Sequence, residues 1–372
     1  MPGSIYLAVT AFASGSTLCF GLCFLFLHIP KSLFLKPYRR ARKMMALAYL
    51  GLSLLYVLEI IFDHQGGNIV LTRSIKLAVG SFQALLFTYT FISLINTGFA
   101  IRKRLLWEVI PIGAFTLAIL ITGLLGGDSV AFNASYFLFI LYYLSMLIRY
   151  LFLFFREYKA CSERADNYYA DDEALRIRWI YYSFWGIFTI GVFLVPLLFV
   201  HENFYYTAFT LSFIVFYSYF GIGFIQYAFR YKRIAPLAIV SEVRKPTNND
   251  NSVQYAQKQH IRQALDVWLS KNSFLQPGLT IEMLASELST NRTYLSNYIN
   301  QVEQQTFRSW INSLKINRAK ELLLEHPDML VVEVANLAGY SDSSNFNKQF
   351  VKQTGISAQT WRKQHLIAEP QA

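Results

Sequence analysis

Seven stretches of apolar residues constrain the fold more than any other feature of this sequence. They lie at about 5–27, 44–62, 77–96, 105–125, 134–155, 179–200 and 204–227. Each is near or above the roughly 20 residues that a helix needs to cross a bilayer. Hydrophobic residues make up 54% of the chain and charged residues 15%, whereas soluble domains carry about 25% charged residues. We therefore expect residues 1–230 to form a seven-span transmembrane domain in an all-α protein.

The distribution of Lys and Arg between the loops predicts the orientation of these spans. The first loop reads KSLFLKPYRRARK, the third IRKR and the segment after the last span RYKR, and the fifth loop is also basic. The N-terminus and the fourth and sixth loops contain none. Cytoplasmic loops are enriched in Lys and Arg, so we expect an outside N-terminus and a cytoplasmic C-terminal domain. Residues 1–27 lack the features of a cleaved signal peptide, and the first helix should remain.

A few polar side chains lie inside the predicted spans, chiefly Gln83, Asn96 and Arg149. An ionisable group at membrane depth is a functional candidate by default. Arg149 is near the inner end of its span, which favours snorkelling of its guanidinium to the surface. Tyrosine pairs occur at span ends, at 142–143, 181–182 and 205–206. Interfacial anchoring is the favoured interpretation of these pairs, and a ligand cage is the alternative.

The composition changes at residues 231–252, where two prolines and an Asn/Asp/Ser-rich end are typical of a linker. The stretch VQYAQKQHIRQALDVWLSKN that follows has the periodicity of an amphipathic helix. It could pair with a copy of itself or pack on the domain after it, and the sequence leaves both open. We expect residues 253–372 to form a separate soluble domain.

The segment LTIEMLASELSTNRTYLSNYINQ has the spacing of a helix-turn-helix unit. Thr280 and Asn291 are placed to cap its two helices, with a short connection at Ser289 and Thr290. The small Ala285 sits where the first helix must approach the second. The segment therefore predicts two short helices packed at an angle.

A second unit follows a long amphipathic segment and reads VVEVANLAGYSDSSNFNKQFVKQTG. Ala335 repeats the small contact of the first unit. Gly339 can adopt the left-handed turn conformation, Ser341 or Asp342 can cap the next helix, and Gly355 can end it. Two such units joined by one helix are a specific arrangement.

These strings resemble the AraC/XylS family of transcription regulators over roughly residues 253–365. The family order A-x-x-x-G-[FY]-x-[DS]-x-S-x-F-x-x-x-F-x-x-x-x-G is present in Ala335, Gly339, Tyr340, Asp342, Ser344, Phe346, Phe350 and Gly355. Two positions depart from the family pattern: Ser357-Ala358 replaces Thr-Pro, and Trp361-Arg362 replaces Tyr-Arg. Ser357 can still cap the closing helix, so we expect the fold to survive.

The resemblance implies that the second helix of each unit enters a major groove of double-stranded DNA. It places Thr293, Ser296 and Asn297 of the first unit, and Ser343, Ser344, Asn347 and Lys348 of the second, at base edges. Asn can pair with adenine and Lys can donate to guanine, while Arg292 and Lys352 are better placed for phosphates. The alternative for each residue is a solvated helix face, which is equally favoured for the serines.

The sequence shows no catalytic constellation, phosphate-binding glycine loop or metal-ligand spacing, so we expect no enzyme activity, cofactor or metal. The hypothesis is a one-component sensor in a bacterial inner membrane. It would couple an unknown signal ligand to promoter binding through a change in dimer geometry across residues 228–270. Candidate partners are a second copy of the chain and RNA polymerase. A transporter or integral-membrane enzyme with an appended regulator, and a passive anchor, are the alternatives.

Overall fold

The structure is a computed structural model, and it describes residues 3–31, 35–63, 69–96, 99, 101–126, 129–170, 174–199, 203–239 and 251–368. Within these ranges the regular structure is helical, with one isolated β-bridge between Tyr169 and Thr280. The chain divides into two compact units, which are described separately below. The first comprises residues 1–161 and 176–243, and the second comprises residues 162–175 and 244–372.

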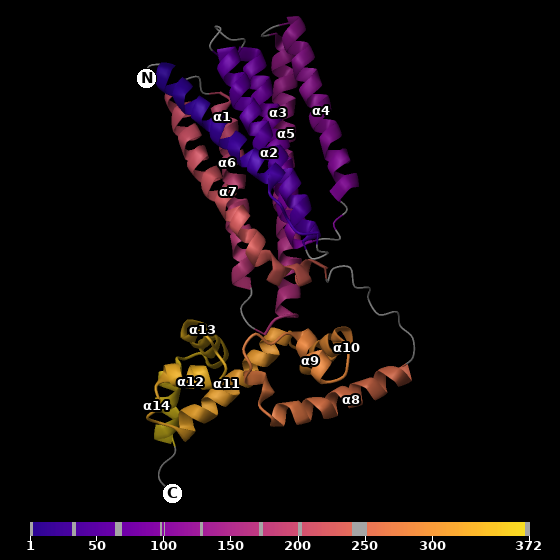
Figure 1. Cartoon of the computed structure of the whole chain (residues 1–372), viewed down its shortest axis with the longest axis vertical. Helices are drawn as coiled ribbons and strands as arrows, with labels where there is room; N and C mark the ends of the chain where they lie inside the picture. Colours follow the sequence, from indigo (N-terminus) through magenta and orange to yellow (C-terminus); the bar gives the residue numbers. More distant parts are fainter. Residues whose placement is uncertain are drawn as a thin grey trace. The chain divides into compact units, whose positions relative to one another are not determined.

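Seven helices in the first unit are long and apolar enough to cross a membrane (Figure 1). They are α1 (Gly3–Phe26), α2 (Lys36–Asp63), α3 (Ile69–Ile95), α4 (Ile101–Gly126), α5 (Val130–Asp166), α6 (Ala174–Leu197) and α7 (Asn203–Ile239). The described residues thus contain seven candidate membrane helices, as the apolar stretches predicted. Most helices extend beyond the apolar stretches, because hydropathy marks the hydrocarbon-facing part of a helix and not its polar ends.

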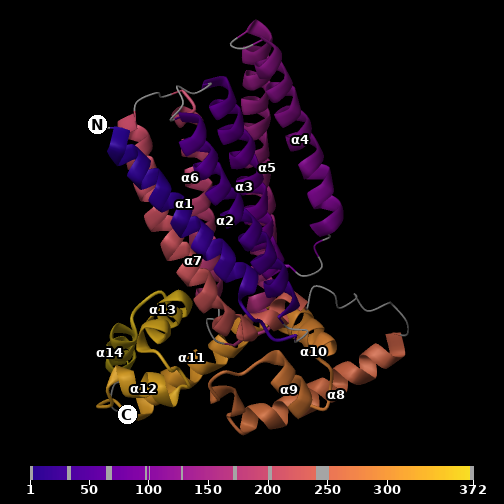
Figure 2. The ribbon, with the colours of Figure 1, turned by 45° about the horizontal axis from the view of Figure 1, so that its top comes forward.

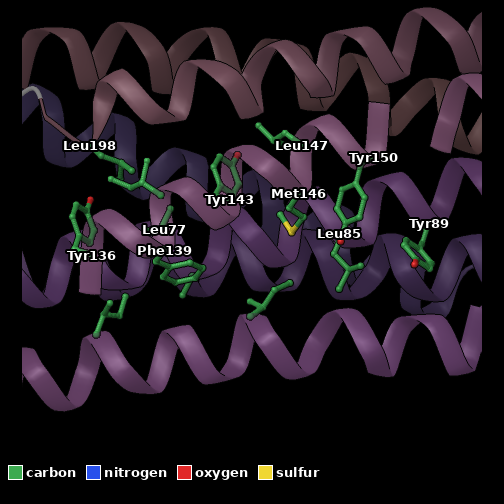
Figure 3. Packing of buried hydrophobic residues seen from close by; sticks show 14 of the residues in the cluster. Leu77, Leu85, Tyr89, Tyr136, Phe139, Tyr143, Met146, Leu147, Tyr150 and Leu198 are labelled. Carbon is green, nitrogen blue, oxygen red and sulfur yellow. The ribbon is translucent and has the colours of Figure 1, made fainter. Parts of the chain in front are cut away.

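Aromatic side chains dominate the packing of this unit. The hydroxyl of Tyr49 donates to the carbonyl of Tyr217, and that of Tyr38 donates to the carbonyl of Phe224, both at 2.7 Å. A buried tyrosine is stable when its hydroxyl finds such an acceptor. Figure 3 shows another part of the core, in which Tyr143 of α5 packs in one cluster with hydrophobic residues of α3.

The polar side chains predicted inside the spans all have partners. Gln83 Nε2 donates to the carbonyl of Ala48 at 2.7 Å, and Asn96 Nδ2 donates to Glu157 Oε2 at 2.7 Å. Arg149 forms an ion pair with Glu108 of α4 at 3.1 Å, and its side chain is 51% exposed. Pairing with a carboxylate lowers the cost of a charge at this depth.

The second unit contains the two helix-turn-helix units and the helix before them. Its elements are α8 (Asn251–Ser270), η2 (Ser273–Leu275), α9 (Ile281–Glu287), α10 (Arg292–Tyr298), η3 (Ile299–Glu303), α11 (Phe307–Glu325), α12 (Val331–Leu337), α13 (Ser343–Thr354) and α14 (Ala358–Ala368). Figures 1 and 2 show α11 between the group α8–α10 and the group α12–α14. The predicted arrangement of two helix-turn-helix units joined by a helix is thus observed.

The predicted linker at 231–252 differs from the structure at its start. Helix α7 continues to Ile239, so the first part of that segment is helical, and α8 begins at Asn251. Residues 240–250 lie outside the described ranges. The second unit also includes residues 162–175, from the loop between α5 and α6, which the sequence did not assign to it.

Helix caps form at the predicted positions. Thr280 accepts from Met283 N at 3.2 Å, and Asn291 accepts from Tyr294 N at 2.9 Å. In the second helix-turn-helix unit, the sequence offered Ser341 and Asp342 as caps, and Asp342 caps α13. These caps satisfy amide groups at the first turn that have no partner within the helix.

Helix α8 packs inside the second unit through its apolar face, on which Ile261, Leu265 and Trp268 are buried. The indole of Trp268 stacks on Trp310 at 6.1 Å and donates to Glu287 at 2.8 Å. These contacts favour the packing role over pairing with a second copy, because they cover the face that a dimer would use.

Candidate nucleic-acid interface

Helix α13 presents a polar face and buries the opposite one. Phe346 and Phe350 are fully buried in the core of the second unit, and Asn347, Lys348 and Lys352 are exposed. Exposed Ser344 completes this face, since residues three, four and eight positions apart lie on one side of a helix. Ser343 is half-buried at the first position. The four exposed residues can therefore meet one ligand surface together.

Helix α10 has a similar but less exposed arrangement. Leu295 and Tyr298 are buried, while Thr293, Ser296 and Asn297 are half-buried on another side. The half-buried residues sit three and four positions apart, which places them on one side of the helix. The structure thus brings the three predicted residues of the first helix-turn-helix unit together on one side of α10.

Asn300 is a further polar residue at this face that the sequence did not single out. It is exposed, and its Nδ2 donates to Ser296 Oγ at 3.3 Å. It lies seven positions after Thr293, so extending the helical periodicity by one more turn would have found it. A π-helical turn continues the helix here.

Arg292 faces other residues of the unit, although we predicted a phosphate contact for it. Its guanidinium lies 3.6 Å from Glu282 Oε1 and 6.0 Å from the ring of Tyr168, and its side chain is 19% exposed. The neighbouring carboxylate and the π-face of the ring both attract a guanidinium. A phosphate contact through Arg292 would have to compete with these interactions.

The backbone near Gly339, in the turn of the second helix-turn-helix unit, packs closely against η2 and α11. Gly339 has φ of 79°, and a Cβ at this position would collide with the carbonyl of Leu275 in η2. The buried ammonium of Lys315 donates to the carbonyl of Gly339 at 2.9 Å. Glycine is required both for the left-handed turn and for the close backbone approach.

A short segment from the loop between α5 and α6 packs on the first helix-turn-helix unit. The amide of Ala170 donates to the carbonyl of Leu279, and that of Ile281 donates to the carbonyl of Tyr168, each at 3.0 Å. These two bonds form the isolated β-bridge between Tyr169 and Thr280. We call residues 162–170 the loop clasp.

Two side chains of the loop clasp also bind the rest of the second unit. Tyr168 Oη donates to Glu282 Oε2 at 2.6 Å, and burial together with this bond raises the pKa of Tyr168. Asp166, the last residue of α5, pairs with Arg308 of α11 at 3.1 Å. No local pattern in the sequence predicted these contacts, because they join residues more than 100 positions apart.

Comparison with known proteins bears on the C-terminal part of the chain. Residues 284–364 match the model of a family described as "Helix-turn-helix domain". The segment is similar to the melibiose operon regulatory protein of Escherichia coli (33% identical over 86 residues) and the Msm operon regulatory protein of Streptococcus mutans (29% over 87). The C-terminal unit contains an AraC-type helix-turn-helix domain.

The similarity to these relatives is limited to this domain. The two alignments each cover 23% of this chain, and 28% and 31% of the respective relatives. A third alignment, with the HTH-type transcriptional activator RhaR of Cronobacter sakazakii, is 31% identical and covers 19% of this chain and 24% of that protein. No solved structure matches. The chain therefore contains an AraC-type helix-turn-helix domain in its C-terminal part, and seven candidate membrane helices lie in the part of the chain that the structure describes.

The two departures from the AraC/XylS pattern leave the closing helix intact. Ser357 Oγ accepts from the amide of Thr360 at 3.2 Å, and Ala358 is buried. Trp361 contacts Phe350 with ring centroids 6.1 Å apart, and Arg362 donates to the carbonyl of Met329 at 2.7 Å. The AraC-type domain thus retains its last helix, as expected. Among the described residues, no group of His, Cys, Asp and Glu is arranged to hold a metal ion.

Proposed function

We propose that this protein is a membrane-embedded, sequence-specific regulator in which the seven-helix unit controls DNA binding by the AraC-type domain. The observation that carries the proposal is the loop clasp. A segment that joins two membrane-spanning helices is part of the DNA-binding unit through backbone and side-chain hydrogen bonds. A passive anchor needs no contact of this kind.

The loop clasp also supports the orientation predicted from the loop charges. The clasp and the C-terminal domain are separated in the sequence by α6 and α7, and both belong to the second unit. Two crossings return the chain to the same side of a membrane. We propose a multi-pass inner-membrane protein with an outside N-terminus and a cytoplasmic DNA-binding domain, on the side where the basic loops lie.

The route of coupling in this proposal runs through α5. This helix extends from Val130 to Asp166 without interruption, and its last turn belongs to the second unit. Movement of α5 would pull on the ion pair with Arg308 and on the contact between Tyr168 and Glu282. Because Glu282 and Tyr168 also hold Arg292, a shift of the clasp would change the availability of that guanidinium to a phosphate.

A change in dimer geometry across residues 228–270 is the alternative route. It would act through α8, whose described apolar face packs inside the second unit. A transporter or membrane enzyme with an appended regulator is the alternative function, and it would use the loop clasp to report its own turnover. Binding to RNA polymerase remains a proposal for the AraC-type domain.

The first experiment tests sequence-specific binding. The full chain in nanodiscs is incubated with fragmented genomic DNA, and bound fragments are sequenced at a stated salt concentration. We expect a motif that spans two successive major grooves, and we expect Asn347→Ala to weaken its binding by roughly 5-fold to 150-fold. Salt-dependent binding without any enriched motif would contradict sequence-specific recognition, and with it the proposed regulator function.

The second experiment tests coupling through the loop clasp without knowledge of the signal. Substitutions at Gln83, Asn96 and Arg149 are introduced into the wild type and into an Asp166→Arg background, and a promoter reporter is measured. We expect them to change output in the wild type and to lose that effect in the Asp166→Arg background. Restoring the pair with Arg308→Asp in the same chain should restore the effect. Equal reporter output from the wild type and from every variant would indicate that the membrane unit is a passive anchor.

A further inference from the structure

A cavity of about 100 Å³ lies inside the seven-helix unit, between α2, α3, α5, α6 and α7. Its wall is mostly apolar and rich in aromatic side chains. These include Tyr56, Phe87, Tyr143, Phe184 and Phe213. For comparison, an engineered apolar cavity of roughly 150 Å³ holds one benzene molecule. The cavity here is smaller than that, so its volume and lining fit at most one small ring or a short chain.

The two charged side chains in the cavity wall neutralise each other. Lys76 Nζ lies 2.7 Å from Glu59 Oε1, and these side chains are 11% and 8% exposed. Tyr6 donates to the same carboxylate at 2.7 Å, and the ammonium lies 3.9 Å from the centre of the Tyr206 ring. A charged ligand would lose its hydration without gaining an unmatched counter-charge from this pair. The wall therefore favours a neutral ligand.

Gln83 contributes an unsatisfied acceptor to the same wall. Its Nε2 donates to the carbonyl of Ala48, and because a carbonyl can only accept, the orientation of the amide is fixed. Its Oε1 is buried and has no hydrogen-bond partner among the described residues. A buried acceptor without a donor is destabilising, so a ligand that brings an O–H or N–H group to Gln83 would gain from satisfying it.

We infer that this cavity binds a small neutral ring compound with one hydrogen-bond donor, of which a phenol is the simplest form. The ring would pack among the aromatic side chains, and the hydroxyl would donate to Gln83. Tyr143 and Tyr206, each from a tyrosine pair for which the sequence favoured interfacial anchoring and left a ligand cage as the alternative, line this cavity. The inference rests on the proposed function in one respect, since it makes such a compound the signal.

The test measures binding to the full chain in nanodiscs by isothermal titration, with empty nanodiscs as the blank. The probes are p-cresol, p-xylene, in which a methyl group replaces the hydroxyl, and 4-methylbenzoate, which is charged. We expect p-cresol to bind roughly tenfold more tightly than p-xylene, the value of about one hydrogen bond. We expect no binding of 4-methylbenzoate.

Two variants locate the site. Gln83→Leu should reduce the preference for p-cresol over p-xylene to about one, and Ala84→Phe, which fills the cavity, should weaken both probes. Gln226→Leu is the matched control, because Gln226 is an exposed glutamine of α7 that does not line the cavity. Retained binding of p-xylene by Gln83→Leu and Gln226→Leu shows that the cavity is still formed in these two variants.

Each other outcome overturns a defined part of the inference. Equal affinities for p-cresol and p-xylene exclude the donor requirement, and binding of 4-methylbenzoate excludes a neutral ligand. If a nanodisc lipid occupies the cavity, native mass spectrometry will detect it and Ala84→Phe will release it, and the small-ligand site is then excluded. If none of the probes binds, the small-ligand site is likewise excluded. Selection of a DNA motif by the full chain would still support the proposed regulator function in that case. Binding of p-cresol without any change in reporter output would retain the site and exclude its role as the sensor.

Discussion

The hydroxyl of Tyr168 donates a hydrogen bond of 2.6 Å to the carboxylate of Glu282, which is 114 positions later in the chain. Tyr168 lies between two candidate membrane helices, and Glu282 lies in the first turn of α9. The bond connects the segment between these two helices to a helix-turn-helix unit.

Removing the hydroxyl should loosen the loop clasp. We expect Tyr168→Phe to cost about 1 kcal/mol, because a partly exposed hydrogen bond contributes about that much. The amide of Ile281, which donates to the carbonyl of Tyr168, should exchange roughly fivefold faster. Hydrogen–deuterium exchange with mass spectrometry measures this, with Tyr219→Phe in the membrane unit as the control. Unchanged exchange at Ile281 would mean that the hydroxyl does not hold the clasp.

The contribution of the Tyr168 hydroxyl should depend on pH only in alkaline solution. Burial and the bond to Glu282 raise its pKa above the ordinary value of 10.0, so the folded state favours the protonated phenol. The stabilisation is then fully present below pH 10 and is lost as the pH rises through the raised pKa. We expect the difference in unfolding free energy between wild type and Tyr168→Phe to be constant from pH 6 to about 9 and to shrink above about 10. A decrease below pH 8 would contradict this assignment.

Gly339→Ala should destabilise the AraC-type domain more than other glycine substitutions do. It combines the strain of a left-handed alanine with a collision against the carbonyl of Leu275, and we expect a cost of roughly 3 kcal/mol or more. Gly355→Ala is the matched control, since its φ of 80° is similar and its Cβ would meet open space. That control should cost about 1 kcal/mol. Hydrogen-exchange protection across α11 and α13 measures the destabilisation by each substitution. Equal losses of protection in the two variants would show that the close packing of Gly339 contributes nothing.

Replacement of Lys315 should loosen the turn of the second helix-turn-helix unit. Its ammonium donates to the carbonyl of Gly339, and Lys315→Met removes that donor while it keeps most of the aliphatic side chain. The half-buried carbonyl then lacks this donor, at a cost of about 1 kcal/mol. Lys320→Met, in the same helix but half-exposed, is the control. Chemical denaturation monitored by exchange in α12 and α13 separates the two, and an equal effect would assign the loss to helix α11 itself.

Lys352→Ala should weaken DNA binding without changing its sequence preference. Lys352 is exposed in the last turn of α13, where a contact with phosphate is expected to release about one counterion. The slope of log K against log salt should therefore become less steep by about 0.9. Lys271→Ala, exposed in the loop after α8, is the control and should leave the slope unchanged. A change of motif in Lys352→Ala would instead place this side chain at a base edge.

Local patterns along the chain determined the elements of both units. An apolar stretch long enough to cross a bilayer predicts a spanning helix by itself, and caps such as Thr280 and Asn291 involve residues only three positions apart. The exposed face of α13 also follows from helical periodicity, as Asn347 and Lys348 show. Each of these features depends on neighbours within a few residues, so no knowledge of the tertiary structure was needed.

The tertiary structure decided how these elements are connected. In the loop clasp, Tyr168 binds Glu282 and Asp166 binds Arg308. Arg292 lies beside Glu282 and Tyr168, a contact that its position in the motif did not indicate. The cavity beside Gln83 is likewise formed by side chains from five helices. Contacts of this kind depend on how distant segments meet in space, and neither residue of such a pair carries a local signal of its partner.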